Sequence, residues 1–300
     1  MEKTEVSSLA KINFGLEVAG LRPDGYHELR TLFQTISLGD RLIFRPGQED
    51  KILLTGDLKD ITWDENNLIY QAAINLKQEA RAKPGVEIEV QKIIPPGRGL
   101  AGGSSNAAMT LLVLNRFWGL NLPSDRLFEL AASIGADVPF FLYGGLCFGT
   151  GRGEILKPLS DLLAGWLVIV VPDFALSTRL IFKEFDAVAP SLTSRDKESK
   201  INQFLERPDR SLFCQFKNDL ELAAFKIYPE LAEIKQEMAR SGAELSMMTG
   251  SGSAIYGFFE DKLRAEKAAD KFIARYGHYK VVLAETVGRE LYREMLLTGA

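Results

Sequence analysis

Apolar and polar residues alternate along residues 8–18, near the start of the chain. The apolar positions are Ala10, Ile12, Phe14 and Leu16, and the positions between them are Lys11, Asn13, Gly15 and Glu17. A period of two residues is typical of a β-strand, which here would have one apolar face. Residues 22–25, Arg-Pro-Asp-Gly, carry the proline and glycine of a turn. Further strands are predicted at residues 31–38 and 40–44.

Helical and strand patterns follow each other irregularly through the rest of the chain. Helices are predicted at residues 67–80, 104–118, 124–134, 219–241 and 263–276, and strands at residues 86–94, 167–171, 253–259 and 280–286. This irregular order indicates an α+β protein rather than a doubly wound one. A boundary near residues 150–165 would give domains at residues 1–160 and 161–300. The polar residues 187–210 are expected to form a loop-rich, mobile region around a helix.

The composition is that of a globular protein, with 46% apolar and 25% charged residues and a net charge of -4. Such a charge gives no broad field for nucleic acid or an anionic membrane, so an anionic substrate must be held locally. Cys147 and Cys214 form neither a disulfide framework nor a metal-binding spacing. The first ten residues lack the apolar core of a signal peptide, and no apolar run approaches the ~20 residues of a membrane span. We therefore expect a reduced cytoplasmic protein.

Four glycines and two serines mark the segment 97–108, Gly-Arg-Gly-Leu-Ala-Gly-Gly-Ser-Ser-Asn-Ala-Ala, which follows two prolines and precedes a predicted helix. Glycines let backbone N–H groups approach an anion closely, and the start of the helix adds unpaired N–H groups and a positive dipole end. The pattern predicts a phosphate cradle built from backbone, with Ser104 or Ser105 as the N-cap of the helix.

Other interpretations of this loop fit less well. It contains the G-x-G-x-x-G string of dinucleotide-binding proteins, but the acidic residue expected about 20 positions later is absent. It has no lysine, as a Walker A loop would need, and the chain has no H-R-D or D-F-G signature of protein kinases. A glycine turn that merely caps a helix would need fewer glycines, so phosphate binding is favoured.

The loop resembles the nucleotide loop of GHMP kinases, which include galactokinase, homoserine kinase, mevalonate kinase and phosphomevalonate kinase. The resemblance implies bound ATP, accompanied by Mg²⁺, with Ser105 either a ligand of the metal or simply a helix cap. The ATP contacts that it implies are Pro96, Gly97, Gly99, Leu100, Ala101, Gly102, Gly103, Ser104, Ser105 and Asn106. Arg98 replaces a residue that is usually small in the family, and it either contacts a phosphate or faces solvent.

Two further segments strengthen this resemblance. Residues 11–16, 22–29 and 31–34 are similar to the first motif of the branch that acts on 4-diphosphocytidyl-2-C-methyl-D-erythritol, and Arg-Pro-Asp-Gly-Tyr-His is its most specific part. Residues 249–254, Thr-Gly-Ser-Gly-Ser-Ala, look like the family's third motif. The substrate contacts that the resemblance implies are Asn13, Tyr26, His27, Phe182, Thr249, Gly250, Ser251 and Gly252. Taken without the family, Tyr26 and His27 could merely pack on a strand, and residues 249–252 could be an ordinary turn.

Lys11 and Asp137 are the catalytic candidates that the resemblance implies. Asp137 stands in Gly-Ala-Asp-Val-Pro, which matches the family's aspartate motif, and it would accept the proton of the attacking hydroxyl group. Lys11 would lie beside Asp137 and the transferring phosphoryl group. From the residues alone, Asp137 could instead be an N-cap before a proline-initiated turn, and Lys11 a solvated edge lysine.

The resemblance implies an α+β, two-domain GHMP kinase fold with the active site in the cleft between the domains. It further implies transfer of the γ-phosphoryl group of ATP to the 2-hydroxyl of the diphosphocytidyl erythritol, a step of the non-mevalonate route to isoprenoid precursors. The alternatives are a mevalonate- or homoserine-type kinase, which Tyr26-His27 disfavours, and a catalytically silent ligand sensor, which Lys11 and Asp137 disfavour. No nucleic acid, membrane or protein partner is implied.

Overall fold

The computed structural model describes residues 3–80, 85–162, 164–189 and 199–298, and two sheets organise them. The first sheet contains β1 (Thr4–Leu21), β2 (His27–Pro46), β3 (Ile52–Gly56), β4 (Val86–Gln91), β5 (Leu146–Thr150) and β6 (Ile155–Pro158). The second contains β7 (Trp166–Val171), β8 (Leu245–Met248), β9 (Ile255–Phe259) and β10 (Lys280–Glu285). The α+β class is therefore as predicted.

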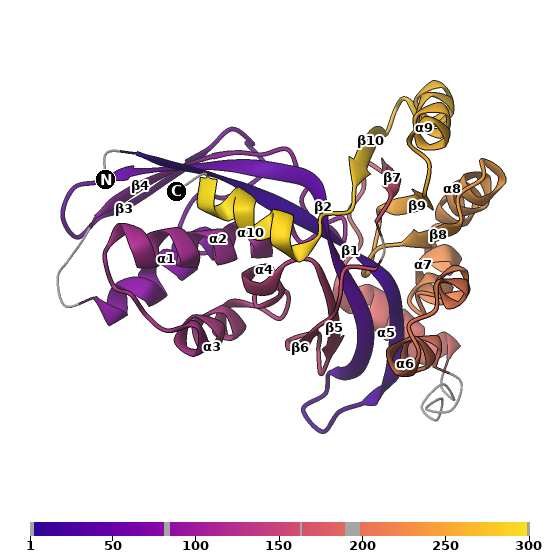
Figure 1. Cartoon of the computed structure of the whole chain (residues 1–300), viewed down its shortest axis with the longest axis horizontal. Helices are drawn as coiled ribbons and strands as arrows, with labels where there is room; N and C mark the ends of the chain where they lie inside the picture. The colour runs from indigo at the N-terminus through magenta and orange to yellow at the C-terminus, as the bar shows by residue number, and fades with distance from the viewer. Residues whose placement is uncertain (1–2, 81–84, 163, 190–198, 299–300) are drawn as a thin grey trace.

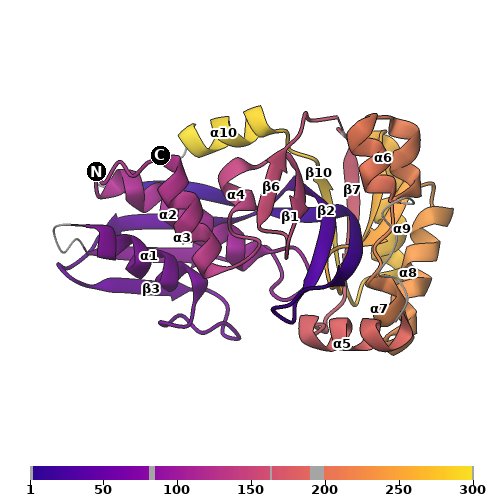
Figure 2. The ribbon, with the colours of Figure 1, turned by 90° about the horizontal axis from the view of Figure 1, so that it is seen from below.

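Helices cover one face of the first sheet, whereas the second sheet has helices on both faces (Figures 1 and 2). The N-terminal half comprises the first sheet with α1 (Leu68–Glu79), α2 (Gly102–Phe117), α3 (Ser124–Ile134) and α4 (Phe140–Tyr143). The C-terminal half comprises the second sheet with α5 (Thr178–Val188), α6 (Lys200–Glu206), a 3₁₀ helix (Arg210–Gln215), α7 (Glu221–Ile227), α8 (Pro229–Arg240) and α9 (Lys262–Tyr276). The last described helix is α10 (Arg289–Thr298). Of the polar stretch 187–210, residues 190–198 lie outside the described residues.

A long antiparallel hairpin of β1 and β2 runs through both halves (Figure 1). Backbone bonds between Arg22 and Tyr26 and between Gly25 and Arg22 close the predicted turn. The two strands predicted at residues 31–38 and 40–44 are one continuous strand. The edge of β2 that faces away from β1 pairs with β5 over Thr31–Gln34 and with β4 over Arg41–Pro46. The strand therefore continues across both partners.

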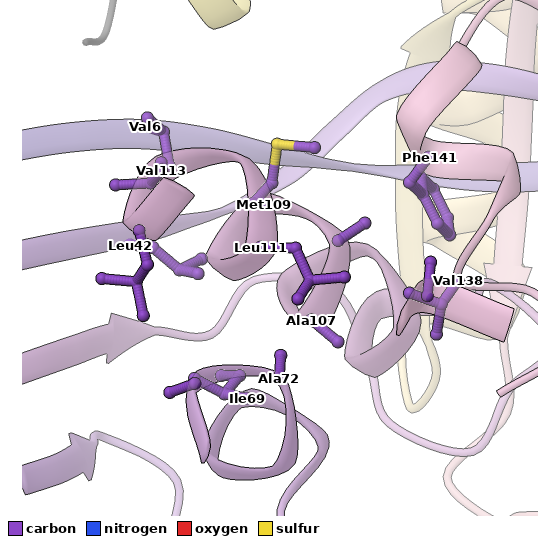
Figure 3. Close-up of a cluster of buried hydrophobic side chains, with 14 of the residues drawn as sticks. Val6, Leu42, Ile69, Ala72, Ala107, Met109, Leu111, Val113, Val138 and Phe141 are labelled. Atoms are coloured by element: carbon purple, nitrogen blue, oxygen red, sulfur yellow. The ribbon is translucent and has the colours of Figure 1, made fainter. Parts of the chain in front are cut away.

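The core of the N-terminal half lies between its sheet and its helices. Val6 and Leu42 from the sheet, Ile69 and Ala72 from α1, and Met109 from α2 belong to one cluster of buried side chains (Figure 3). Small residues such as Ala72 allow α1 to approach α2 closely. Burial of apolar side chains of this size stabilises the fold by roughly 1.5–3 kcal/mol each.

The second sheet packs on the hairpin with the face opposite α8 and α9. Phe14 of β1 makes edge-to-face contacts with Phe213, Tyr256 and Phe258, at centroid distances of 4.9, 6.1 and 5.6 Å. The apolar face predicted for residues 8–18 is thus buried against the C-terminal half. The opposite face is also buried at Lys11 and Asn13, so the interpretation of Lys11 as a solvated edge lysine is wrong.

Two features of the C-terminal half differ from the sequence pattern. The single helix predicted at residues 219–241 is two helices, because Pro229 begins α8 and Tyr228, with non-helical backbone, separates it from α7. Proline is favourable at the first position of a helix but not within one. The helix α5 was not predicted at all, although Ser177 caps it through a bond from the backbone N–H of Leu180.

The helix α10 leaves the second sheet and packs on the N-terminal half (Figure 1). Tyr292 is buried in the N-terminal core, and its hydroxyl donates to the carbonyl of Phe141 at 2.7 Å. The domain division at residue 160 stays a prediction, because this helix and the hairpin both connect the two halves. Within the described residues, no helix is long and apolar enough to cross a membrane.

Candidate active site

A cavity of about 620 Å³ lies where the glycine-rich loop, the β1–β2 hairpin and α5 meet. Of the predicted site residues, its wall contains Lys11, Asn13, Pro96, Gly97, Gly99, Ala101, Gly102, Gly103, Ser104, Asn106, Asp137, Phe182, Gly250, Ser251 and Gly252. Five predicted site residues are not part of this wall: Tyr26, His27, Leu100, Ser105 and Thr249. Residues up to 241 positions apart in the sequence thus line one cavity, as Lys11 and Gly252 show.

The glycine-rich loop enters α2 through Ala101, which has a left-handed backbone with φ 54°. The helix consequently starts at Gly102, two residues before the predicted start, and the prediction that Ser104 or Ser105 is its N-cap is wrong. The N-cap is Ala101, and it forms no side-chain cap bond. The first N–H groups of the helix therefore stay available beside the cavity, as an anion site requires.

Ser105 is turned away from the cavity. Its hydroxyl is fully buried, donates to the carbonyl of Leu9 at 2.6 Å and accepts from Ser8 at 2.7 Å. A magnesium ligand must face the phosphates, so the geometry does not support the predicted role of Ser105 in metal binding. Leu100 is likewise fully buried, and its carbonyl accepts from the backbone N–H of Lys11.

Lys11 and Asp137 are brought together as predicted. Lys11 Nζ lies 3.7 Å from Asp137 Oδ2 and donates to Asn13 Oδ1 at 2.8 Å. Burial lowers the pKa of the Lys11 ammonium below its ordinary value, and the Asp137 carboxylate opposes that shift. The Asp137 side chain is 34% exposed, so it can reach a ligand, whereas that of Lys11 is only 4% exposed.

Asp137 does not act as a helix cap. The helix α4 has Pro139 at its N-cap and no side-chain cap bond. The carboxylate is therefore free to face the cavity from the segment between α3 and α4. This removes the alternative in which Asp137 only stabilises a turn.

Thr249 connects the third glycine motif with β1. Its hydroxyl lies 3.3 Å from Asn13 Oδ1 and 3.2 Å from the carbonyl of Gly99, and it accepts from the backbone N–H of Asn13. Thr249 is fully buried, so its contacts are with protein. A Cβ on Gly99 would lie 2.1 Å from the Thr249 carbonyl oxygen, which shows how closely the two glycine motifs approach.

Arg98 lines the cavity, and its guanidinium is held by backbone carbonyls. Its guanidinium donates to the carbonyls of Pro172 at 2.9 Å, Asp173 at 2.6 Å and Pro96 at 3.1 Å. Pro172 and Asp173 follow β7, so Arg98 ties the glycine-rich loop to the C-terminal half. Arg98 thus has a connecting role, and its contact with a phosphate stays a prediction.

The predicted base-binding residues gather around α5. His27 stacks on Phe182, with ring centroids 4.9 Å apart and an angle of 19° between the rings. Tyr26 is 56% exposed, and the guanidinium of Arg152 lies 4.9 Å from its ring centre. Phe182 lines the cavity, and His27, which is outside the wall, packs against the Phe182 ring.

Several residues of the cavity wall were not predicted from the sequence. Trp63, Asn66 and Lys92 line the end near α1, and Arg152 lines the end near Tyr26. Single aromatic, amide and cationic residues in loops carry no periodic signal, so no pattern could indicate them. Arg152 follows the glycines of residues 149–151, which is the only local signal near it.

A buried network positions the first turns of α2. Asp40 accepts from the backbone N–H groups of Ile93 and Ile94 at 2.7 and 2.8 Å, from Asn106 Nδ2 at 3.0 Å and from Lys92 Nζ. Asn106 is buried, and no described residue bonds its side-chain oxygen. That oxygen belongs to a residue of the cavity wall, so it remains an acceptor for a bound ligand.

Comparisons with known proteins agree with this geometry. Residues 67–145 match the GHMP kinases N terminal domain, and residues 201–278 match the GHMP kinases C terminal model. The chain is 40% identical, over 90% of its length and 94% of the relative, to 4-diphosphocytidyl-2-C-methyl-D-erythritol kinase of Thermodesulfovibrio yellowstonii. It is 37% identical to the protein of that name from Bacillus subtilis, over 86% of this chain and 89% of the relative.

Solved structures give the same picture of the fold. A 4-(cytidine 5'-diphospho)-2C-methyl-D-erythritol kinase is similar with a TM-score of 0.79 and 36% identity, over 95% of this chain and 99% of that one. Homoserine kinase from Cytophaga hutchinsonii has a TM-score of 0.76 at 17% identity, over 96% and 95% of the two chains. The second similarity shows a shared fold alone.

Proposed function

We propose that this chain, which belongs to the GHMP kinase family and within it to the 4-diphosphocytidyl-2-C-methyl-D-erythritol kinases, transfers the γ-phosphoryl group of ATP to the 2-hydroxyl of that diphosphocytidyl erythritol. The products are ADP and the 2-phosphate, as a step of the non-mevalonate route to isoprenoid precursors. The observation that carries the proposal is the Lys11–Asp137 pair beside the glycine-rich loop, in a cavity that continues to Phe182.

The geometry of that pair supports the catalytic roles that we propose for it. Asp137 accepts the proton of the 2-hydroxyl group as it attacks, and Lys11, held by Asn13, stabilises negative charge on the transferring phosphoryl group. Phosphoryl transfer has a loose transition state in which positioning and charge stabilisation dominate. A buried lysine with few alternative partners suits this role, because a low local dielectric strengthens its attraction for the phosphoryl oxygens.

ATP is assigned to the end of the cavity between the glycine-rich loop and α1. The phosphates would meet the N–H groups at the start of α2, near Gly102, Gly103 and Ser104. The adenine would lie against the apolar wall that Trp63 and Leu68 help to form. This placement leaves the γ-phosphoryl group toward Lys11 and Asp137.

The acceptor is assigned to the other end. Its diphosphate lies chemically between the base and the erythritol, and Arg152 lies beside Tyr26 while the next residue, Gly153, lies near Asp137. Arg152 sits over the Tyr26 ring, and a Cβ on the next residue, Gly153, would lie 4.0 Å from Asp137 Oδ1. The buried Nε of Arg152 has no hydrogen-bond partner in the described structure, and its contact with Glu154 is 3.7 Å long. Arg152 is therefore the cation proposed for the diphosphate.

Mg²⁺ is proposed to accompany ATP. No group of three or more His, Cys, Asp or Glu side chains among the described residues could hold a metal ion. The ion would thus rest mainly on the phosphates and water, with Ser104 as a cavity residue that could add a ligand. When bound, it would neutralise charge on the phosphates.

The direct test is incubation with ATP, Mg²⁺ and the diphosphocytidyl erythritol, followed by detection of ADP and the 2-phosphate. Parallel reactions with mevalonate and homoserine address the other GHMP kinases, and the absence of any ADP would favour the ligand sensor. ADP formed with homoserine or mevalonate, but not with the cytidylyl substrate, would overturn the proposal.

A further inference from the structure

His27 is held on α5 through two different parts of its ring. Its Nε2 lies 2.8 Å from Asp186 Oδ1, and its face stacks on Phe182. Phe182 and Asp186 are four residues apart, so they lie on the same side of α5. His27 and Phe185 also form a T-shaped ring contact, with centroids 6.4 Å apart and an angle of 87° between the rings. The imidazole is therefore fixed in place, and its side chain is only 10% exposed.

The bond to Asp186 determines which nitrogen carries the proton. A carboxylate can only accept a hydrogen bond, so Nε2 must be the donor. In a neutral imidazole the other nitrogen, Nδ1, is then an acceptor. No described residue hydrogen-bonds to Nδ1. Because the two nitrogens lie on different edges of the ring, anchoring Nε2 on α5 leaves the Nδ1 edge turned away from that helix.

We propose that Asp186 is a positioning residue that makes His27 select cytosine over uracil. The inference rests on the function proposed above. Cytosine has an amino group at position 4, which donates, whereas uracil has a carbonyl oxygen there, which accepts. An Nδ1 acceptor forms a hydrogen bond with the cytosine amino group and repels the uracil oxygen. Phe182 covers one face of the imidazole, so a base can meet His27 along its free edge.

Without Asp186, His27 is no longer restricted to one tautomer. The form with the proton on Nδ1 can donate to the uracil oxygen. The uridylyl substrate therefore gains a hydrogen bond to Nδ1, and the cytidylyl substrate loses one. A purely structural tie between α5 and the hairpin acts differently, because loosening the wall would weaken both substrates alike. The ratio of the two substrates therefore separates selection from simple support.

The test compares kcat/KM for the cytidylyl substrate and its uridylyl analogue, at about pH 8, where histidine side chains are ordinarily neutral. In Asp186→Ala we expect the cytidylyl preference to fall roughly tenfold, the size of one correctly paired hydrogen bond. In Asp186→Asn the cytidylyl preference should fall less, because the amide oxygen of the asparagine can still accept from Nε2. The matched control is Glu184→Ala on the same helix, whose carboxylate pairs with Lys226 and should leave the preference unchanged.

Nitrogen NMR of the ligand-free protein gives a second readout. The chain has only two histidines, so in a His278→Gln variant all histidine ring signals come from His27. We expect the proton on Nε2 with Asp186 present, and a mixture of tautomers in Asp186→Ala. A full cytidylyl preference in Asp186→Ala, or an equal loss for both substrates with unchanged NMR signals, would overturn the inference. A wild-type protein that phosphorylates neither substrate would instead refute the proposed function.

Discussion

At the end of the cavity proposed for ATP, two runs of residues, 61–69 and 96–106, supply most of the wall, whereas at the end proposed for the acceptor separate elements supply it. The ATP end offers backbone N–H groups at the start of α2. The acceptor end offers the side chains of Phe182 on α5 and Arg152 after β5. Phosphates need only closely placed N–H donors, which a local segment can provide. A base and a diphosphate need rings and cations from different directions, which only the folded chain brings together.

The largest effect is expected at the junction of the two ends. Asp137→Asn should lower kcat by roughly 10²–10⁴-fold, because the variant loses the group that accepts the hydroxyl proton. The affinity for a non-hydrolysable ATP analogue should change little, since Asp137 belongs to neither binding end. Asp125→Asn, on the exposed start of α3, serves as the control. A folded Asp137→Asn variant with near-normal kcat would remove Asp137 from the catalytic pair.

A change at the ATP end should affect ATP alone. Gly103→Val is expected to weaken ATP binding by roughly tenfold to a hundredfold, through loss of charge-assisted contacts. A Cβ on Gly103 meets only Leu68, at 3.7 Å, so the fold should tolerate it, whereas a Cβ on Gly102 would lie 2.8 Å from Ile94. Isothermal titration with the ATP analogue measures the change, and Gly103→Ala should show a smaller one. Unchanged affinity would mean that the loop only caps α2.

A change at the acceptor end should leave ATP binding intact. Arg152→Ala is expected to raise KM for the cytidylyl substrate by about tenfold, from the loss of one hydrogen bond to a charged group. The KM of Arg152→Lys should lie between those of the wild type and Arg152→Ala, because a lysine keeps the charge but not the planar guanidinium. Steady-state kinetics at saturating ATP gives the values, with Arg126→Ala outside the cavity as the control. An equal rise in KM for ATP would contradict the proposal that Arg152 contacts only the acceptor.

The pH profile probes the group that serves both ends. Lys11 acts as a cation, so activity should fall as pH rises through its pKa, which burial lowers below 10.5. The fall in kcat/KM should approach tenfold per pH unit above that pKa, and this parameter reports the free enzyme. Lys11→Arg should move the fall to higher pH if the variant remains active. A wild-type profile that stays flat up to pH 10.5 would contradict the lowered pKa.

Local signals predicted the glycine-rich loop, most of the helices and the apolar face of β1. They misplaced the start of α2, because a non-glycine residue with left-handed backbone, Ala101, precedes it. They could not indicate that His27 meets Phe182 and Asp186, about 155 positions later. Such contacts depend on how α5 packs on the hairpin, and no spacing along the chain encodes that. The resemblance named His27 and Phe182 but gave no sign of Asp186 or Arg152.

The return of α10 to the N-terminal half has a consequence for how the protein is made. Chains grow from the N-terminus on the ribosome, and domains generally fold as they emerge. The N-terminal core includes Tyr292, so it stays incomplete until the whole C-terminal half has been synthesised. At typical elongation rates those roughly 120 residues take on the order of ten seconds. Throughout that interval the nascent N-terminal half keeps an apolar site open, which a chaperone could cover.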